Sequence, residues 1–239
     1  MEIQTKDEVL ETFESDNLII RAMEAPNVTR DSGKLYYDCT IWTTEFELMK
    51  QNKFSSVSST LLVPNVGVST YKNVGFLVDA RMVDVFHISK TDSLSNGNML
   101  DGDFNAGDKD FDTTSELATY IKENNATEMN ELNINLDLNG VIGLVVTKCP
   151  IEVELIRKML FVIKALEHVT GITYPLYEYD RANGKITKIE LIEELVSDLI
   201  AYESRHPIYN TSDYLFYSED SIEPFYDTIT DFNKIEKGL

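Results

Sequence analysis

The residues best suited to chemistry form an acidic segment near the middle of the chain. Between residues 101 and 112, carboxylate or amide side chains recur at close to alternate positions. They are Asp101, Asp103, Asn105, Asp108, Asp110 and Asp112. Calcium is bound by about six to eight oxygen atoms, which a flexible turn can supply at this spacing. The segment therefore predicts a calcium site.

The start of this segment resembles the calcium-binding loop of an EF-hand, which carries Asp, Asp and Asn in the same alternation. It departs from that pattern at three positions. Ala106 stands at the place of the glycine, Asp108 at that of an apolar residue, and Asp112 at that of the final glutamate. The alternative interpretation is a solvated loop whose carboxylates favour the N-terminus of the next helix. The departures favour this second interpretation.

A second set of residues is similar in order to the parts of an ADP-ribosyltransferase. These parts are Arg21, the segment Ser58-Ser59-Thr60, and the pair Glu152 and Glu154. The resemblance implies that Arg21 holds the phosphates of NAD, that Ser58 braces the nicotinamide side, and that Glu154 stabilises the ribosyl cation. The serine segment reads Ser-Ser-Thr rather than Ser-Thr-Ser. The two glutamates also fall in the first turn of a predicted helix, where the helix dipole alone accounts for them.

The charge of the chain limits its partners. Asp and Glu number 41 and Lys and Arg 21, which gives a net charge of −20. Such a chain is repelled by nucleic acid and by anionic membranes, so we expect no direct contact with either. Cations, basic proteins and small molecules in a locally different pocket remain compatible, and we expect a protein partner, which a basic protein would fit. The first residues lack a signal peptide pattern, and no apolar stretch is long enough to span a bilayer. We therefore expect a cytoplasmic protein, or one in the host-cell cytoplasm if it is viral.

The pattern of apolar residues predicts an α+β fold. Helices are predicted at about 115–123, 150–169 and 189–203, the first with a capping box at Thr113 and Glu116. Strands are predicted at 18–23, 35–48, 58–63, 75–78, 82–88, 133–138, 141–146, 174–179 and 185–188. Residues 26–33 are predicted as a turn, and the strands at 75–78 and 82–88 as a hairpin or close neighbours. We expect a mixed or antiparallel sheet with about three helices on one face.

The domain organisation that we expect is simple. Residues 1–206 form a single α+β domain, and residues 207–239 an acidic, aromatic-rich tail that packs on the domain or on a partner. Cys39 and Cys149 are too few for a disulfide framework, and buried free thiols are expected.

Three functions fit the sequence. The one favoured is a non-enzymatic acidic interaction protein: a phage or mobile-element accessory factor, an inhibitor or an assembly subunit. It rests on the charge and on the lack of the common catalytic and nucleotide-binding motifs, and it involves no cofactor. The alternatives are an NAD-dependent ADP-ribosyltransferase-like enzyme and a calcium-dependent binding module.

Overall fold

The computed structural model describes residues 7–31, 34–38, 40–50, 57–91, 110–147 and 153–189. The chain divides into two compact units. The first consists of Met1–Glu24, Leu48–Glu152 and Pro175–Ile189, and the second of Ala25–Glu47, Val153–Tyr174 and Glu190–Leu239. The predicted helix at 189–203, the tail at 207–239 and both cysteines lie outside the described residues, apart from Ile189.

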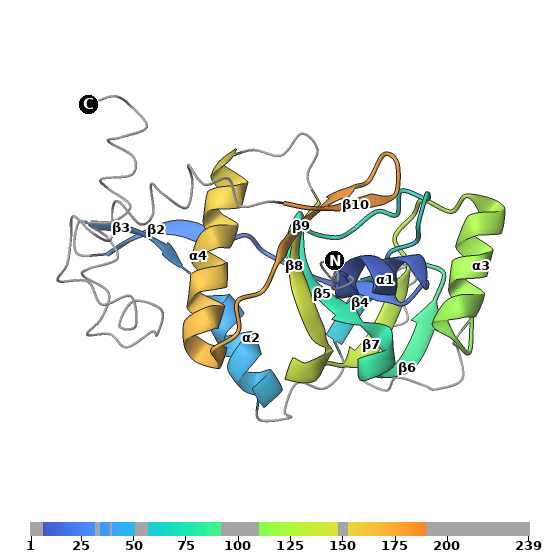
Figure 1. Cartoon of the computed structure of the whole chain (residues 1–239), viewed down its shortest axis with the longest axis horizontal. Helices are drawn as coiled ribbons and strands as arrows, with labels where there is room; N and C mark the ends of the chain where they lie inside the picture. Colours follow the sequence, from blue (N-terminus) through green and yellow to red (C-terminus); the bar gives the residue numbers. More distant parts are fainter. Residues whose placement is uncertain are drawn as a thin grey trace, which may run out of the picture. The chain divides into compact units, whose positions relative to one another are not determined.

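The first unit is built on an eight-stranded sheet with the order β10-β9-β8-β5-β1-β4-β7-β6 (Figure 1). The strands are β1 (Leu18–Met23), β4 (Val57–Leu61), β5 (Val74–Asp79), β6 (Asp84–Ser89), β7 (Glu131–Asn135), β8 (Val141–Val146), β9 (Leu176–Asp180) and β10 (Lys185–Lys188). Among these strands β8 and β9 run parallel, and the other neighbours run antiparallel. The predicted α+β class with a mixed sheet is confirmed.

The central strands are buried on both faces, as their continuous apolar runs predict. All six residues of β5 are buried, and β8 is buried except at Ile142. Strands whose two faces are both covered lose the alternation of apolar and polar residues.

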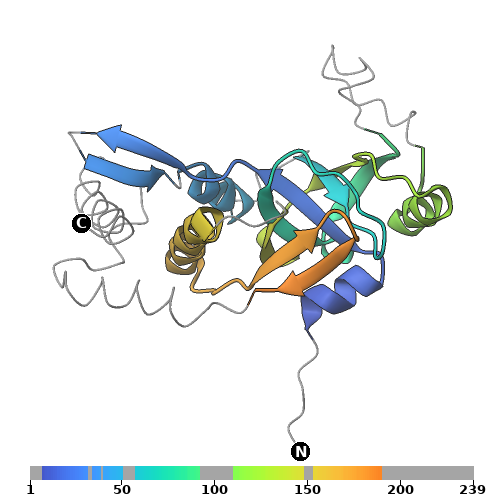
Figure 2. The ribbon, with the colours of Figure 1, turned by 90° about the horizontal axis from the view of Figure 1, so that it is seen from above.

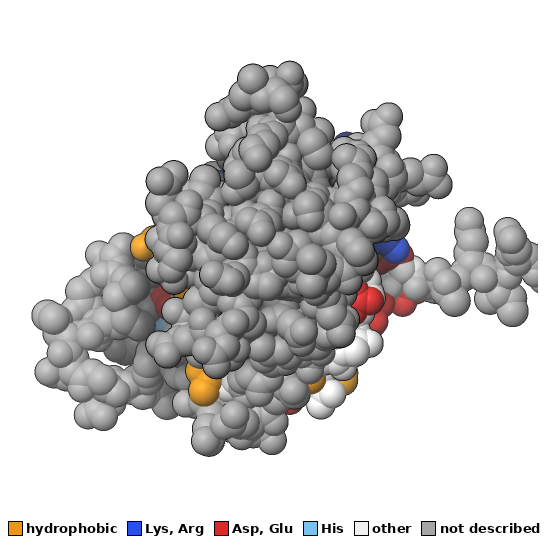
Figure 3. Space-filling view, turned by 90° about the vertical axis from the view of Figure 1, so that its left-hand side faces the viewer, with side chains coloured by type: hydrophobic (Ala, Val, Ile, Leu, Met, Phe, Trp, Pro, Cys, Tyr) orange, Lys and Arg blue, Asp and Glu red, His pale blue; other side chains and the backbone are white. Residues whose placement is uncertain are grey.

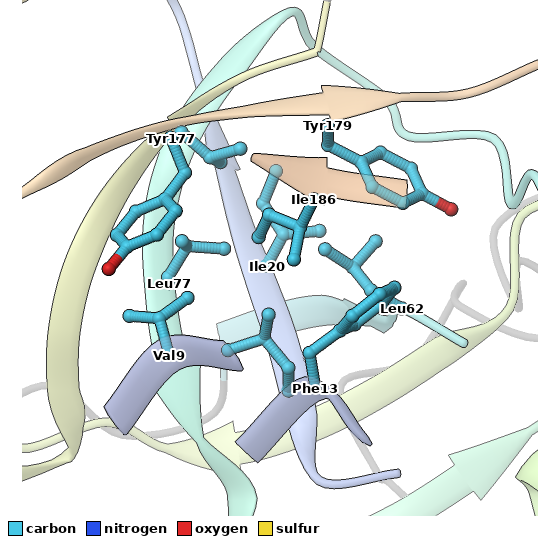
Figure 4. Packing of buried hydrophobic residues seen from close by; sticks show 10 residues of the cluster. Val9, Phe13, Ile20, Leu62, Leu77, Tyr177, Tyr179 and Ile186 are labelled. Carbon is cyan, nitrogen blue, oxygen red and sulfur yellow. The ribbon is translucent and has the colours of Figure 1, made fainter. Parts of the chain in front are cut away.

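A short N-terminal helix, α1 (Glu8–Glu14), packs on one face of this sheet (Figure 2). Its N-cap is Asp7, whose Oδ1 accepts hydrogen bonds from the backbone N–H groups of Val9 and Leu10 at 3.1 and 3.3 Å. Val9 and Phe13 are four residues apart, so both point from one side of the helix into the core. Figure 4 shows them facing side chains of the sheet and its connections. These are Ile20, Leu62, Leu77, Tyr177, Tyr179 and Ile186. The sequence has helical spacing over residues 6–13, where Val9, Leu10 and Phe13 share one face, but this helix is not one of the three expected to cover the sheet.

The predicted pairing of the strands at 75–78 and 82–88 is wrong. A single 3₁₀ turn, η1 (Ala80–Met82), separates β5 from β6. β5 pairs with β1 and β8, whereas β6 pairs with β7 at the edge of the sheet. The physical reason is burial, because β5 is apolar from Val74 to Val78 and is buried along its whole length, so it needs neighbours on both sides. β6 alternates exposed and partly buried residues in its first half, which suits an edge.

The second unit contains the hairpin of β2 (Asn27–Asp31) and β3 (Lys34–Asp38), most of α2 (Thr40–Lys50), and α4 (Val153–Thr170). Two predictions are wrong here. Residues 26–33 are predicted as a turn, but Asn27–Asp31 is a strand. The strand predicted at 35–48 ends at Asp38, and the helix α2 begins at Thr40. Trp42, Phe46 and Met49 explain that helix, since their spacing of four and three residues places them on one face, and each is at most 1% exposed. The helix predicted at 150–169 is confirmed as α4.

No helix in the described ranges is long and apolar enough to cross a membrane.

Candidate functional site

The candidate site lies on helix α3 (Thr114–Asn124) of the first unit, and a capping box positions this helix. Thr113 Oγ1 accepts a hydrogen bond from the backbone N–H of Glu116 at 3.2 Å. In return, Glu116 Oε2 accepts from the backbone N–H groups of Asp112 and Thr113 at 2.8 and 3.3 Å. The helix ends at Asn125, which has a left-handed conformation with φ of 47°. The predicted start signal is therefore confirmed.

Helix α3 has one buried and one open face. Leu117, Ala118 and Ile121 are buried. The other face borders a hollow of about 580 Å³. Its lining residues are Asp110, Phe111, Ser115, Glu116, Thr119, Tyr120 and Glu123.

The lining combines negative charge with aromatic surface. Three of its residues, Asp110, Glu116 and Glu123, carry carboxylates, and no Lys, Arg or His is among the described lining residues. Lys90, just outside the lining, forms an ion pair with Asp110, with Lys90 Nζ 3.9 Å from Asp110 Oδ1. The rings of Phe111 and Tyr120 lie against each other, with centroids 5.5 Å apart and planes tilted by 43°. Carboxylates neutralise an ammonium or guanidinium group, and aromatic faces attract it. This arrangement can accept a cationic side chain.

The three carboxylates are engaged to different degrees. Asp110 Oδ2 accepts hydrogen bonds from Ser89 Oγ at 3.2 Å and from the backbone N–H of Lys90 at 3.0 Å, which ties the segment to the end of β6. Glu116 caps the helix. Glu123 is exposed and makes no hydrogen bond or ion pair with the part of the chain that the structure describes. Glu123 is therefore the carboxylate best placed to meet a ligand.

Only some of the predicted calcium ligands belong to the residues that the structure describes. Asp110 and Asp112 are described, and Asp101, Asp103, Asn105 and Asp108 lie outside the described residues. Within the ranges that are described, no three or more His, Cys, Asp or Glu residues gather closely enough to hold a metal ion. The calcium site stays a prediction.

Two of the ADP-ribosyltransferase candidates lie side by side. Arg21 Nη1, from β1, donates a hydrogen bond to the backbone oxygen of Ser58 on β4 at 3.3 Å. The β1–β4 register pairs Ile20 with Thr60, and its continuation places Arg21 opposite Ser59. Because side chains alternate along a strand, the Ser59 hydroxyl shares the face of Arg21, and the Ser58 hydroxyl lies on the other face.

Within the segment Ser58-Ser59-Thr60, the structure draws attention to Ser59 rather than to Ser58, to which the resemblance gave the role. It is 3% exposed, and its Oγ is buried without a hydrogen-bond partner. Of the remaining candidates, Glu154 belongs to the start of α4 in the second unit, and Glu152 lies outside the described residues.

The hollow itself was also missed from the sequence, although a signal for it exists. Glu116, Tyr120 and Glu123 follow one another at intervals of four and three residues, which places them on one side of a helix. Phe111 could not be added from the pattern, because it precedes the helix and meets Tyr120 only once the chain has folded. No family model matches the chain, and no curated protein matches it in sequence.

Proposed function

We propose that the protein is a non-enzymatic acidic interaction protein whose α3 hollow receives a Lys or Arg side chain of a basic protein partner. The observation that carries this proposal is the lining of the hollow, where Glu123, which has no partner among the described residues, lies with Asp110, Glu116 and the Phe111–Tyr120 pair. An inhibitor or an assembly subunit of a phage or mobile element fits this role.

The remaining surface supports association with a protein. A net charge of −20 steers a basic partner toward the molecule. In the first unit, Met82 and Phe86 are 52% and 44% exposed, close to the edge strand β6. Figure 3 shows some acidic and hydrophobic side chains at the margin of the face that it displays. Interfaces between proteins commonly join such apolar contacts to a polar rim.

The test uses hexa-arginine and hexa-lysine peptides as probes in isothermal titration calorimetry. Glu123→Lys should weaken binding by about two- to tenfold, because it replaces an attractive charge at the hollow by a repulsive one. Glu14→Lys is the matched control, since Glu14 is also exposed, lies on α1 of the same unit, and changes the net charge equally. An equal loss in both variants would show that the peptides sense only the net charge, and would remove the hollow from the proposal.

A second candidate is NAD-dependent ADP-ribosyl transfer, which the position of Arg21 beside the serine segment favours, with the Ser59 hydroxyl on the same face as Arg21. It predicts that the protein releases nicotinamide from NAD and that Glu154→Gln abolishes this release. Chromatography of an NAD incubation measures both. If wild-type protein and Glu154→Gln give the same trace as buffer, this candidate is wrong.

A further inference from the structure

A second polar cluster lies at the end of the two parallel strands. Thr147 directly follows β8, and Arg181 directly follows β9. Since parallel strands point the same way, these two residues meet at one edge of the sheet. In sheets that contain parallel strands, ligands commonly bind beyond the carboxyl ends of those strands.

The guanidinium group of Arg181 is anchored at this edge by neutral acceptors. Four acceptors lie within hydrogen-bond distance of Arg181 Nη2 and share its two N–H groups: Thr147 Oγ1 at 2.6 Å, the Lys72 backbone oxygen at 2.9 Å, Asn73 Oδ1 at 3.2 Å, and Thr70 Oγ1. The two threonine hydroxyls lie 3.2 Å apart, and each also donates to the Lys72 backbone oxygen. Thr147 is 0% and Thr70 7% exposed, so the group is held by a buried scaffold.

The positive charge of Arg181 has no carboxylate beside it. No carboxylate in the described ranges forms an ion pair with Arg181, although the chain has 41 acidic residues for 21 basic ones. The adjacent Asp180 turns to the hairpin loop, where it accepts from Ala182 N and Asn183 Nδ2. The ammonium of Lys72 is paired with Glu24. Arg181 is thus the one uncompensated charge of the cluster.

Burial makes this charge costly. Arg181 Nε is buried without a hydrogen-bond partner. Loss of water around the guanidinium lowers the pKa of Arg181 from its ordinary value. Arg181 is half-buried, so its charge is partly removed from water without a carboxylate beside it, which costs the folded state some stability, and a bound anion would offset that cost.

We propose that Arg181, together with the hydroxyls of Thr70 and Thr147, forms a binding site for a small oxyanion, either a phosphate group or a carboxylate. The guanidinium supplies charge and N–H donors, and each hydroxyl can donate its single hydrogen to the anion when it turns away from the Lys72 backbone oxygen. The site is independent of the α3 hollow, which attracts the opposite charge.

The experiment is an NMR titration of the ¹⁵N-labelled full chain with sodium phosphate, at ionic strength held constant with sodium chloride. We expect the chemical shifts of the Thr70, Thr147 and Arg181 amides to change and to reach saturation before the phosphate concentration exceeds about 50 mM. That concentration is well above the Kd of a weak anion site. A parallel titration with sodium acetate separates the two sources, since saturation by acetate alone assigns the site to carboxylate ligands. Shifts that do not saturate in either titration, or that sodium chloride reproduces, would overturn the proposal.

Variants separate an anion site from a purely structural clamp. Arg181→Gln should abolish the saturable shifts. Lys185→Gln should keep the saturable shifts, because Lys185 is exposed on the same hairpin and takes no part in the cluster. It is a matched control, since it removes one positive charge, as Arg181→Gln does. Shifts of equal size in both variants would also overturn the proposal. If Arg181→Gln does not fold, the titration of the wild-type protein alone decides.

Discussion

At the scale of single residues, the side-chain amide of Asn130 takes the place of a peptide group in the hydrogen-bond ladder of the sheet. The residue is 1% exposed, and its side-chain amide pairs with both backbone groups of Leu61: Oδ1 accepts from the N–H at 2.8 Å and Nδ2 donates to the oxygen at 3.1 Å. The β4–β7 register, in which Ser59 faces Leu132, would bring residue 130 opposite Leu61 if it continued. The side chain therefore completes the ladder beyond the last paired residues.

Asn130→Ala should lower the free energy of unfolding by about 2–4 kcal/mol, because it leaves two buried backbone groups of Leu61 without partners. Urea unfolding followed by circular dichroism measures this loss. Asn124→Ala is the control, since Asn124 is exposed on α3 and makes a single hydrogen bond with Tyr120. A loss no greater than that of the control would contradict this role of Asn130.

The carboxylate of Asp79 gives a prediction about pH. Its side chain is 5% exposed and pairs with Arg81, with Asp79 Oδ2 and Arg81 Nη2 2.6 Å apart. Burial alone would raise the pKa of Asp79, but the hydrogen bonds and charge of Arg81 outweigh it and lower the pKa below 3.8. A lowered pKa in the folded state gives stability that is complete above the unfolded pKa and is lost as pH falls through the folded one.

Asp79→Asn removes this titration. The free energy of unfolding of the wild-type protein should therefore fall toward that of Asp79→Asn as the pH falls from about 5 toward 3. This range spans the pKa of the carboxylate in the unfolded chain. Urea unfolding of both proteins at a series of pH values measures the difference. Parallel curves for the two proteins throughout this range would show that Asp79 does not carry the effect.

At the scale of elements, local sequence patterns correctly predicted the helices and strands whose conformation depends mainly on their own residues. The strands β1 and β8 and the helix α4 follow from apolar runs and helical spacing. The strand expected at 35–48 failed because the β-branched and aromatic residues around Trp42 favour strands, while the helical spacing of Trp42, Phe46 and Met49 decided the structure. Pairings such as β6 with β7 depend on distant segments and cannot be read from either strand alone.

The candidate site likewise combines features that depend on local sequence with features that depend on distant segments. The capping box made the start of α3 predictable, since all its atoms come from four adjacent residues. The hollow needs Phe111 and Asp110 to fold back over α3, and the cluster around Arg181 joins three segments of the chain. Neither leaves a contiguous pattern in the sequence.

A close crossing of two segments gives a prediction for the hairpin of β9 and β10. The segment before β5 passes so near the hairpin that a Cβ on Gly67 would lie 1.6 Å from the backbone oxygen of Arg181. Tyr179 holds the segment there, since its hydroxyl accepts from Val68 N at 2.9 Å and donates to Val66 O at 3.1 Å. Gly67→Ala must therefore push the segment away from the hairpin.

Hydrogen exchange of the Val68 amide measures this displacement, and we expect its protection to fall sharply in Gly67→Ala. Gly171→Ala is the control, because Gly171 has φ of +72° but open space around its Cα. That variant should cost about 1 kcal/mol from backbone strain without changing the exchange of Val68. Unchanged protection in Gly67→Ala would contradict the close crossing.

At the scale of the whole molecule, the excess of negative charge acts on stability. With a net charge of −20, the carboxylates repel one another more in the compact state than in the unfolded chain. Salt screens this repulsion, and the Debye length falls from about 30 Å at 0.01 M to about 8 Å at 0.15 M. The melting temperature should therefore rise as sodium chloride increases over this range.

The same charge has the opposite effect on association, and this contrast tests the proposed function. Screening that stabilises the fold weakens the attraction between the molecule and a basic peptide, so the affinity should fall while the melting temperature rises. Calorimetric melting and titration with hexa-arginine in the same series of salt concentrations measure both. Glu123→Lys should reduce the salt dependence of binding more than Glu14→Lys, while both change the salt dependence of melting alike. If binding is insensitive to salt, the contact with the peptide is not electrostatic, and the acidic hollow is not its site.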